Sequence, residues 1–272
     1  IPVSLKPNLF FANLILYRSY TNNLILIHSQ TGEILNVIPL GGDIISNFIK
    51  PITPLVIQSN IEKSFIIVEN DFSSKTCKLI EYNVNILGGL EKNTEIELLG
   101  NILQTPTIEN DSIYVFTHQT TSANKLFKIK LGIDEFIIDW EIEDLQFLST
   151  GAVEFCLHKN NLIFFFDKGS DLFGYVDEST TNPTITVNKT FGTIFNMVSV
   201  PAQDKIILAT AQQPKGKAKI IMADTTDLTN LPRIWEYLVA SDMRTDMVLG
   251  HLIPTNGALI FTSWRDGIRS IK

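Results

Sequence analysis

The sequence of 272 residues is long enough to bury a substantial core, and we expect a single domain over residues 1–272. Apolar residues make up 44% and charged residues 19%, as in an ordinary globular protein. A formal net charge of −7 argues against a nucleic-acid-binding surface. No stretch reaches the roughly 18 apolar residues that a membrane-spanning helix needs, so we expect no transmembrane segment.

The two cysteines and the first residues of the sequence give two further expectations. Cys77 and Cys156 are too few and too far apart for a disulfide framework or a metal-binding knuckle, and we expect both to remain reduced thiols. The sequence begins at Ile1-Pro2 without methionine. We interpret it as a processed mature form or a trimmed sequence, from which any targeting segment has been removed.

Short apolar runs separated by polar or glycine turns follow one another along the whole chain. Over residues 127–131 and 136–142, apolar residues alternate with charged ones, which is typical of strands with one solvent-facing side. The expected strands cover residues 14–17, 24–28 and 34–40; 55–57, 65–68, 78–82 and 95–99; 113–117, 127–131 and 136–142; 153–157, 162–166, 172–176 and 184–188; 197–200, 205–209, 219–222 and 233–238; and 248–252, 258–262 and 268–272.

These strands fall into units of about four, and the spacing of outer-strand residues gives the period. Trp140 and Trp235 are 95 residues apart, or two units, and Asn36 and Trp140 are 104 apart, also two units. Four-stranded units joined only by turns indicate an all-β fold, a β-propeller of about six four-stranded blades. A two-sheet sandwich is the main alternative, but it would not hold so many short strands.

The last unit ends one strand short, and Ile1–Leu5 is left over at the other end of the chain. A blade with an open edge needs a neighbouring strand to protect it. We therefore expect the N-terminal strand Ile1–Leu5 to pair with the last blade and close the ring.

Two features resemble the repeat of the quinoprotein-type (PQQ-like) propellers. One is the turn Thr31-Gly32-Glu33 before an outer strand, and the other is the outer-strand tryptophan at Trp140 and Trp235. The resemblance implies a propeller fold, in which that tryptophan packs between blades. Members without cofactor are binding platforms, and the acidic metal ligands and cofactor-stacking residues of the enzymes are not found here. We therefore expect no cofactor, and an exported or cell-envelope protein.

Motifs for catalysis or metal binding are missing from the sequence. The four histidines, His28, His118, His158 and His251, form no closely spaced pair, so a zinc site is not expected. The sequence contains no nucleophile elbow, glycine-rich phosphate loop or EF-hand.

One cluster of charged and aromatic residues lies in the last unit. Asp242, Arg244 and Asp246 precede its first strand, and Trp264, Arg265 and Asp266 lie between its second and third strands. Those two loops emerge on the same face of a propeller. A tryptophan beside two arginines has the composition of a recognition hot spot or a small anion pocket. Alternatively, the charges pair with each other and Trp264 covers the edge of the blade.

We therefore favour a non-catalytic scaffold for protein–protein interaction over an enzyme. The first alternative is a propeller enzyme, a hydrolase or lyase, with a site at the central channel, where Glu154, His158 and His251 would be the residues to inspect. The second is a glycan-binding module that uses Trp264 or Tyr114 as a stacking surface.

Overall fold

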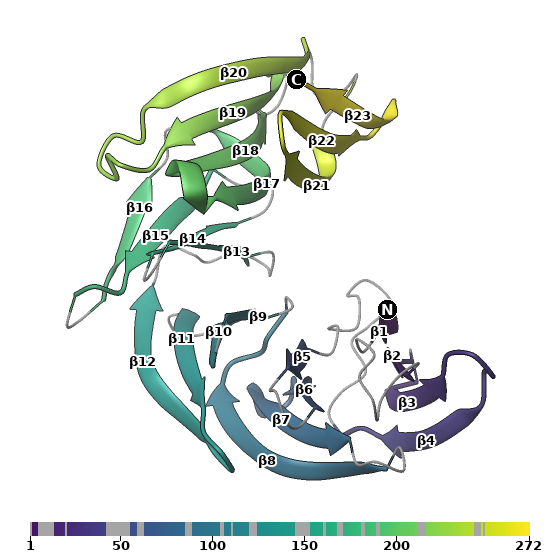
Figure 1. Cartoon of the computed structure of the whole chain (residues 1–272). Helices are drawn as coiled ribbons and strands as arrows, with labels where there is room; N and C mark the ends of the chain where they lie inside the picture. Colours follow the sequence, from purple (N-terminus) through teal and green to yellow (C-terminus); the bar gives the residue numbers. More distant parts are fainter. Residues whose placement is uncertain are drawn as a thin grey trace. The chain divides into compact units, whose positions relative to one another are not determined.

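The computed structural model describes residues 2–4, 14–19, 21–41, 55–58, 63–84, 89–103, 106–109, 111–119, 124–144, 153–159, 162–167, 171–180, 183–188, 191–211, 216–241, 246 and 248–272 (Figure 1). Within these residues lie the strands β1 to β23, one short 3-10 turn at Pro201–Gln203, and no α-helix. No helix there is long and apolar enough to span a membrane. The chain divides into two compact units, Ile1–Gly151 and Ala152–Lys272.

The first unit holds three antiparallel four-stranded sheets, in each of which consecutive strands pair. The first sheet consists of β1 (Pro2–Ser4), β2 (Leu14–Arg18), β3 (Asn23–His28) and β4 (Ile34–Pro39). The second consists of β5 (Leu55–Gln58), β6 (Lys63–Asp71), β7 (Thr76–Val84) and β8 (Leu90–Leu99). The third consists of β9 (Thr107–Glu109), β10 (Ser112–Thr117), β11 (Asn124–Leu131) and β12 (Phe136–Asp144).

The second unit holds two four-stranded sheets and one three-stranded sheet with the same consecutive order. The fourth sheet consists of β13 (Val153–His158), β14 (Leu162–Asp167), β15 (Phe173–Asp177) and β16 (Ile185–Asn188). The fifth consists of β17 (Thr193–Val200), β18 (Lys205–Ala211), β19 (Ala218–Asp224) and β20 (Arg233–Ala240). The sixth consists of β21 (Val248–Thr255), β22 (Ala258–Ser263) and β23 (Gly267–Ile271).

Each strand expected from the sequence overlaps one of these strands, but the expected partner of the N-terminal strand is wrong. Pro2, Val3 and Ser4 pair with Tyr17, Leu16 and Ile15, so β1 is the first strand of the first sheet and does not complete the last one. A strand that pairs with its neighbour in sequence closes a short loop, and a short loop costs less entropy than a long one.

A β-bulge recurs on the fourth strand of four sheets, and it marks the repeat more clearly than the sequence does. The pairing skips one residue on each fourth strand, namely Leu35, Asn93, Asp139 and Ile234. The residue after the bulge is Asn36, Thr94, Trp140 or Trp235. The three outer-strand residues that we equated from their spacing therefore occupy equivalent positions. A bulge bends the strand and increases its twist.

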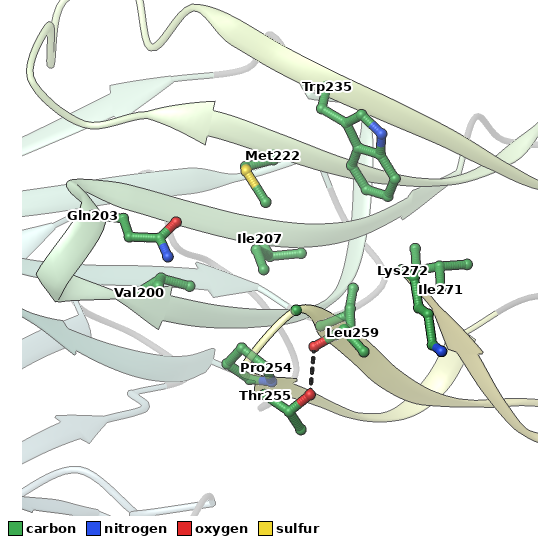
Figure 2. A pocket seen from close by; sticks show the side chains of 12 residues that line it. Val200, Gln203, Ile207, Met222, Trp235, Pro254, Thr255, Leu259, Ile271 and Lys272 are labelled. Atoms are coloured by element: carbon green, nitrogen blue, oxygen red, sulfur yellow. Dashed lines mark hydrogen bonds between the residues drawn. The ribbon is translucent and has the colours of Figure 1, made fainter.

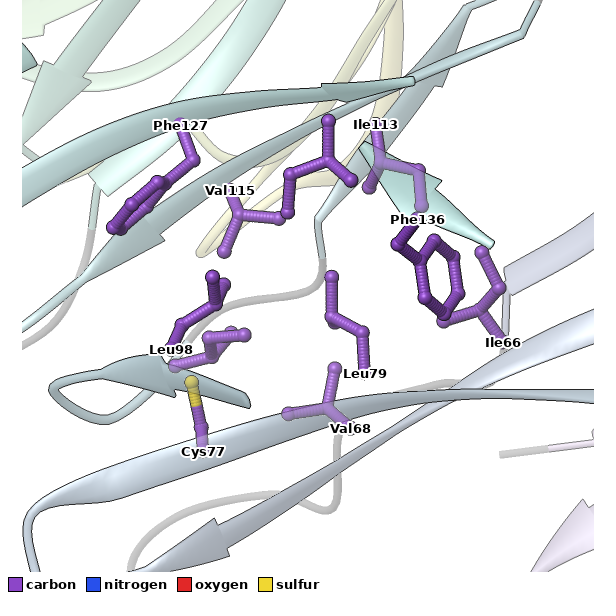
Figure 3. Close-up of a cluster of buried hydrophobic side chains, with 11 residues drawn as sticks. Ile66, Val68, Cys77, Leu79, Leu98, Ile113, Val115, Phe127 and Phe136 are labelled. Carbon is purple, nitrogen blue, oxygen red and sulfur yellow. The ribbon is translucent and has the colours of Figure 1, made fainter. Parts of the chain in front are cut away.

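Alternating side chains bury both faces of the middle sheet in each unit. In β6, Phe65 and Ile67 pack toward the first sheet. Ile66 and Val68 pack toward the third sheet, as Figure 3 shows. In β18, Ile206 and Leu208 belong to the core shared with the fourth sheet, and Ile207 and Ala209 to the core shared with the sixth. Apolar residues at every position of these strands thus reflect burial on two sides.

The two cysteines are free thiols, one in each unit. Cys77 lies in the core between the second and third sheets, and Cys156 packs against the core between the fourth and fifth. Burial raises the pKa of each thiol to about 12. Neither thiol forms the thiolate that reacts or binds a metal at neutral pH.

Candidate functional site

The turn between β22 and β23 carries the tryptophan and arginine that the sequence singled out. Residues 264–266 form the turn, and the backbone N–H of Asp266 donates to Ser263 Oγ at 3.2 Å. Gly267 follows with a φ of +72°, a left-handed conformation that glycine adopts without strain. The Ser263–Gly267 segment thus builds a tight turn that projects Trp264 and Arg265 from the end of the sheet.

Asp246, in the loop that precedes β21, holds this turn in place through hydrogen bonds. Its side chain is buried, with 6% of the residue exposed, and Oδ1 accepts the backbone N–H of Arg265 at 3.1 Å. Its Oδ2 accepts Arg269 Nη1 at 3.1 Å, and the same Nη1 lies 3.5 Å from Asp266 Oδ2. The buried carboxylate therefore joins the loop before the first strand to the turn after the second strand. Asp242 and Arg244 lie outside the described residues.

The outer part of the turn faces solvent. Trp264 is 66% exposed, and Arg265 and Asp266 are exposed as well. Arg269 forms ion pairs with Asp246 and Asp266, so part of the charge in the cluster is internally neutralised. Within the described residues, Arg265 has no ion-pair partner. An exposed indole beside an exposed guanidinium on an anchored turn can stack on an apolar group and bind a carboxylate at the same time.

Arg269 is the member of this cluster that sequence reasoning missed. It lies in β23 opposite Phe261, and its guanidinium is 5.9 Å from the centre of that ring. The signal in the sequence was its position three residues after Asp266, in a strand with isoleucines at positions 268 and 271. A charged side chain that faces a core in such a strand requires a partner, and here the partner is Asp246.

His158 is the most chemically suggestive residue of the enzyme alternative. It ends β13, and its Nδ1 lies 2.5 Å from Ser199 Oγ while Nε2 lies 2.9 Å from Thr225 Oγ1. A serine beside a histidine nitrogen has the geometry of a nucleophile and its base. Here, however, the second nitrogen meets a hydroxyl in place of a carboxylate, and His158 is only 5% exposed. The contacts connect the fourth and fifth sheets, which is a structural role.

The pH dependence of stability tests this role. Burial lowers the pKa of His158, Lys159 lowers it further, and Asp204, which pairs with Lys159, partly offsets the effect. Because the folded pKa lies below the unfolded value of about 6.5, the neutral ring stabilises the fold fully above pH 6.5. This contribution is lost as the pH falls from about 6.5 toward the folded pKa.

We therefore expect His158→Gln to be less pH-sensitive than the native protein. The free energy of unfolding, measured by denaturant titration from pH 8 to pH 5, should fall more steeply for the native protein. The difference in slope should reach up to about 1.4 kcal/mol per pH unit in the window below pH 6.5. His251→Gln, on the exposed part of β21, controls for the replacement of a histidine by glutamine outside the core. Equal slopes for the native protein and His158→Gln would contradict a buried neutral imidazole.

The other residues named for the two alternatives are Glu154, His251 and Tyr114. Glu154 lies in β13 and His251 in β21. Tyr114 is 4% exposed and packs against Trp140, with ring centres 6.4 Å apart, so it cannot serve as a glycan-stacking surface. The described residues contain no group of three or more His, Cys, Asp or Glu side chains that could hold a metal ion.

Comparison with known proteins gives a likeness of fold. No family model and no curated protein matches the sequence. Among solved structures, BamB from Moraxella catarrhalis has a TM-score of 0.58 and 12% identity, over 95% of this chain and 69% of BamB. The C-terminal WD40 domain of Sif2 has a TM-score of 0.62 and 10% identity, over 95% of this chain and 66% of that domain.

A third structure, of a functionally unknown protein from Desulfotomaculum acetoxidans DSM 771, has a TM-score of 0.54 and 13% identity, over 92% of this chain and 72% of that one. BamB and WD40 domains are both β-propellers. Together with the succession of antiparallel sheets, the likeness supports a β-propeller fold.

Proposed function

We propose that this chain is a non-catalytic β-propeller scaffold for protein–protein interaction, and that Trp264, Arg265 and Asp266 form a contact site anchored by Asp246. The supporting observation is the exposure of Trp264 on a turn whose backbone is tied to the buried Asp246. We further propose six blades of the PQQ-like type in one domain over residues 1–272. The recurring bulge at Asn36, Trp140 and Trp235 supports this assignment.

A few residues usually contribute most of the binding free energy of an interface. Tryptophan and arginine are enriched among the residues that contribute most to binding, and they act best when they are rigidly presented. The hydrogen bond from Arg265 N–H to Asp246 Oδ1 holds the turn in place before a partner arrives. An acidic or polar partner surface with an apolar pocket would complement the indole and guanidinium.

Replacing Trp264 and Arg265 with alanine should leave the fold intact and weaken binding. Exposed turn residues typically cost less than about 0.5 kcal/mol of stability when they are truncated. Loss of a central aromatic anchor is expected to remove about 2 kcal/mol or more of binding free energy. Thermal melts measure the first effect, and titration of the partner against native and variant protein measures the second.

Photo-crosslinking from this turn supplies the partner for that titration. A photoreactive amino acid at position 265 should give a defined crosslinked protein, whereas the same group in place of Ile133, which is 92% exposed on the β11–β12 turn, should not. Identical crosslinks from both positions, or unchanged affinity after Trp264→Ala, would overturn the proposed contact site. Binding to oligosaccharides that requires Trp264, without a protein partner, would instead assign a glycan-binding module.

A further inference from the structure

Polar side chains hold one end of the junction between the fourth and fifth sheets. His158, the last residue of β13, contacts Ser199 of β17 through Nδ1 at 2.5 Å and Thr225 through Nε2 at 2.9 Å. The next residue, Lys159, forms an ion pair with Asp204, which lies on the turn between β17 and β18. Two consecutive residues at the end of the fourth sheet thus make three side-chain contacts with the fifth.

The imidazole of His158 lies just inside the surface of the protein. The residue is 5% exposed, whereas Lys159 beside it is exposed. Phe164 packs edge to face against the imidazole, with ring centres 5.5 Å apart, and belongs to the core behind it. A small movement of this end of β13 therefore brings the imidazole into water and leaves the core between the two sheets in place.

The surroundings of His158 suit a neutral ring better than a charged one. In the neutral ring one nitrogen donates and the other accepts, and the hydroxyl groups of Ser199 and Thr225 can take either role. Among the described residues, no carboxylate hydrogen-bonds to the ring. A buried imidazolium would thus have only two hydroxyl oxygens as acceptors, and burial of a charge without an opposite charge in contact is costly.

The charged groups near the ring act in opposite directions. Burial has the largest effect on the pKa of His158 and lowers it, while Asp204 raises this pKa and Lys159 lowers it. Asp177 and Asp224, at the ends of β15 and β19, accept hydrogen bonds from hydroxyl groups of their own turns. Protonation of the buried ring is therefore opposed mainly by the loss of water around it.

We propose that His158 is a pH-sensitive latch on this junction. In mild acid the imidazole takes up a proton, and the end of β13 separates from Ser199 and Thr225 while the strands of both sheets stay paired. At neutral pH the ring is uncharged and the junction is closed. The latch involves the fourth and fifth sheets and not the turn of Trp264, so its test does not depend on the proposed contact site.

Cys156 reports on the opening because it lies two residues before His158. It is half-buried, packs against the core between the two sheets and interacts with Ser199. A dipyridyl disulfide reacts with thiols in acid as well as at neutral pH. Between pH 7.5 and pH 5.5, labelling of Cys156 should accelerate about threefold to tenfold relative to free cysteine, because the open state binds a proton more readily than the closed state. Cys77, which is 1% exposed in the first unit, should stay unlabelled.

Trp235 tests whether the rest of the fifth sheet stays in place. It lines a pocket of about 390 Å³ that residues of the fifth and sixth sheets surround (Figure 2). In a protein that carries Trp140→Phe and Trp264→Phe, the emission of Trp235 should be the same at pH 7.5 and pH 5.5. A shifted emission together with labelling of Cys77 would show unfolding of the whole chain and would overturn the latch.

Two charge variants separate the titration of His158 from the loss of an ion pair. Lys159→Met removes a cation and Asp204→Asn removes a carboxylate, so the closed state binds a proton more readily in the first variant and less readily in the second. The acceleration of Cys156 labelling should therefore be smaller in Lys159→Met than in Asp204→Asn. Both variants break the same ion pair, so a purely structural effect would be equal in the two. Asp204 has a φ of 52°, which asparagine also adopts.

His158→Gln removes the titrating group and should abolish the pH dependence of Cys156 labelling, whatever its rate. The proposal fails if labelling of Cys156 in the native protein does not accelerate in acid. It also fails if His158→Gln keeps the native acceleration, or if Lys159→Met and Asp204→Asn give equal or reversed effects.

Discussion

Replacing Phe164 with alanine is expected to lower the free energy of unfolding of the second unit by about 3–5 kcal/mol. Phe164 is fully buried in β14 and packs against Phe173, with ring centres 5.6 Å apart. It also meets Tyr175 at 6.1 Å and His158 at 5.5 Å, both edge to face. Truncation leaves a cavity where three rings converge, and a packed sheet closes such a cavity only in part.

Phe72 provides the matched control for this substitution. It lies on the turn between β6 and β7 and is 36% exposed, so Phe72→Ala should cost clearly less than Phe164→Ala. Denaturant unfolding followed by circular dichroism measures both variants. Equal losses of stability in the two variants would contradict the packing of Phe164 between the fourth and fifth sheets.

The strands could be predicted from the sequence because the pattern of apolar and polar residues within each strand indicates it. Alternation over 127–131 and 136–142, and continuous apolar runs in strands buried on both sides, gave strand positions that the structure matches within a few residues. The spacing of Asn36, Trp140 and Trp235 also identified equivalent positions, since all three follow a bulge on a fourth strand.

Partnerships between distant residues were harder to predict. The sequence suggested that the loop at Asp246 meets the turn at Arg265, because both follow from the order of strands in one sheet. Nothing in the local sequence connected His158 to Ser199, 41 residues away, or to Thr225, 67 residues away. The placement of Ile1–Leu5 was wrong because an unpaired end was matched to an unfilled edge, without weighing the nearer strand β2.

A repeated turn cap was also present in the sequence and was missed. Asp177 and Asp224 each end the third strand of a sheet, and each accepts the hydroxyl and the backbone N–H of a residue two positions on, Ser179 or Thr226. His28 ends the third strand of the first sheet, where its Nδ1 meets Thr31. A polar residue that fixes this turn thus recurs in three sheets, but with different residue types and spacing, which concealed it from a search for identical motifs.

Arg18→Met is expected to lower the free energy of unfolding of the first unit by about 2–4 kcal/mol. The guanidinium of Arg18, at the end of β2, is buried and donates from Nη1 to the carbonyl of Val68 at 2.7 Å. Its Nη2 donates to Asn22 Oδ1 at 2.8 Å. Arg18 therefore connects the first sheet to the second, and its removal leaves two buried acceptors without this donor.

Burial of the Arg18 guanidinium costs desolvation free energy. This cost limits how much stability the substitution Arg18→Met is expected to remove. Desolvation lowers the pKa of Arg18, while the nearby carboxylate of Glu69 partly offsets the effect. Removing a buried charge sometimes stabilises a protein when the new side chain packs well. Here the acceptors remain, and Asn22 itself holds the carbonyl groups of Leu40 and Gly41 through Nδ2 at 3.3 and 2.8 Å, so loss of Arg18 loosens a network.

A double-mutant cycle separates the network from simple packing. Asn22 has a φ of 58°, so Asn22→Gly removes the amide and keeps the left-handed backbone. Because both variants break one network, their combined loss should fall short of the sum of the single losses by about 1 kcal/mol or more. Arg265→Met, on the exposed turn between β22 and β23, should change stability by less than about 0.5 kcal/mol. Additive losses for Arg18 and Asn22, or a more stable Arg18→Met, would show that the guanidinium does not hold the two sheets together.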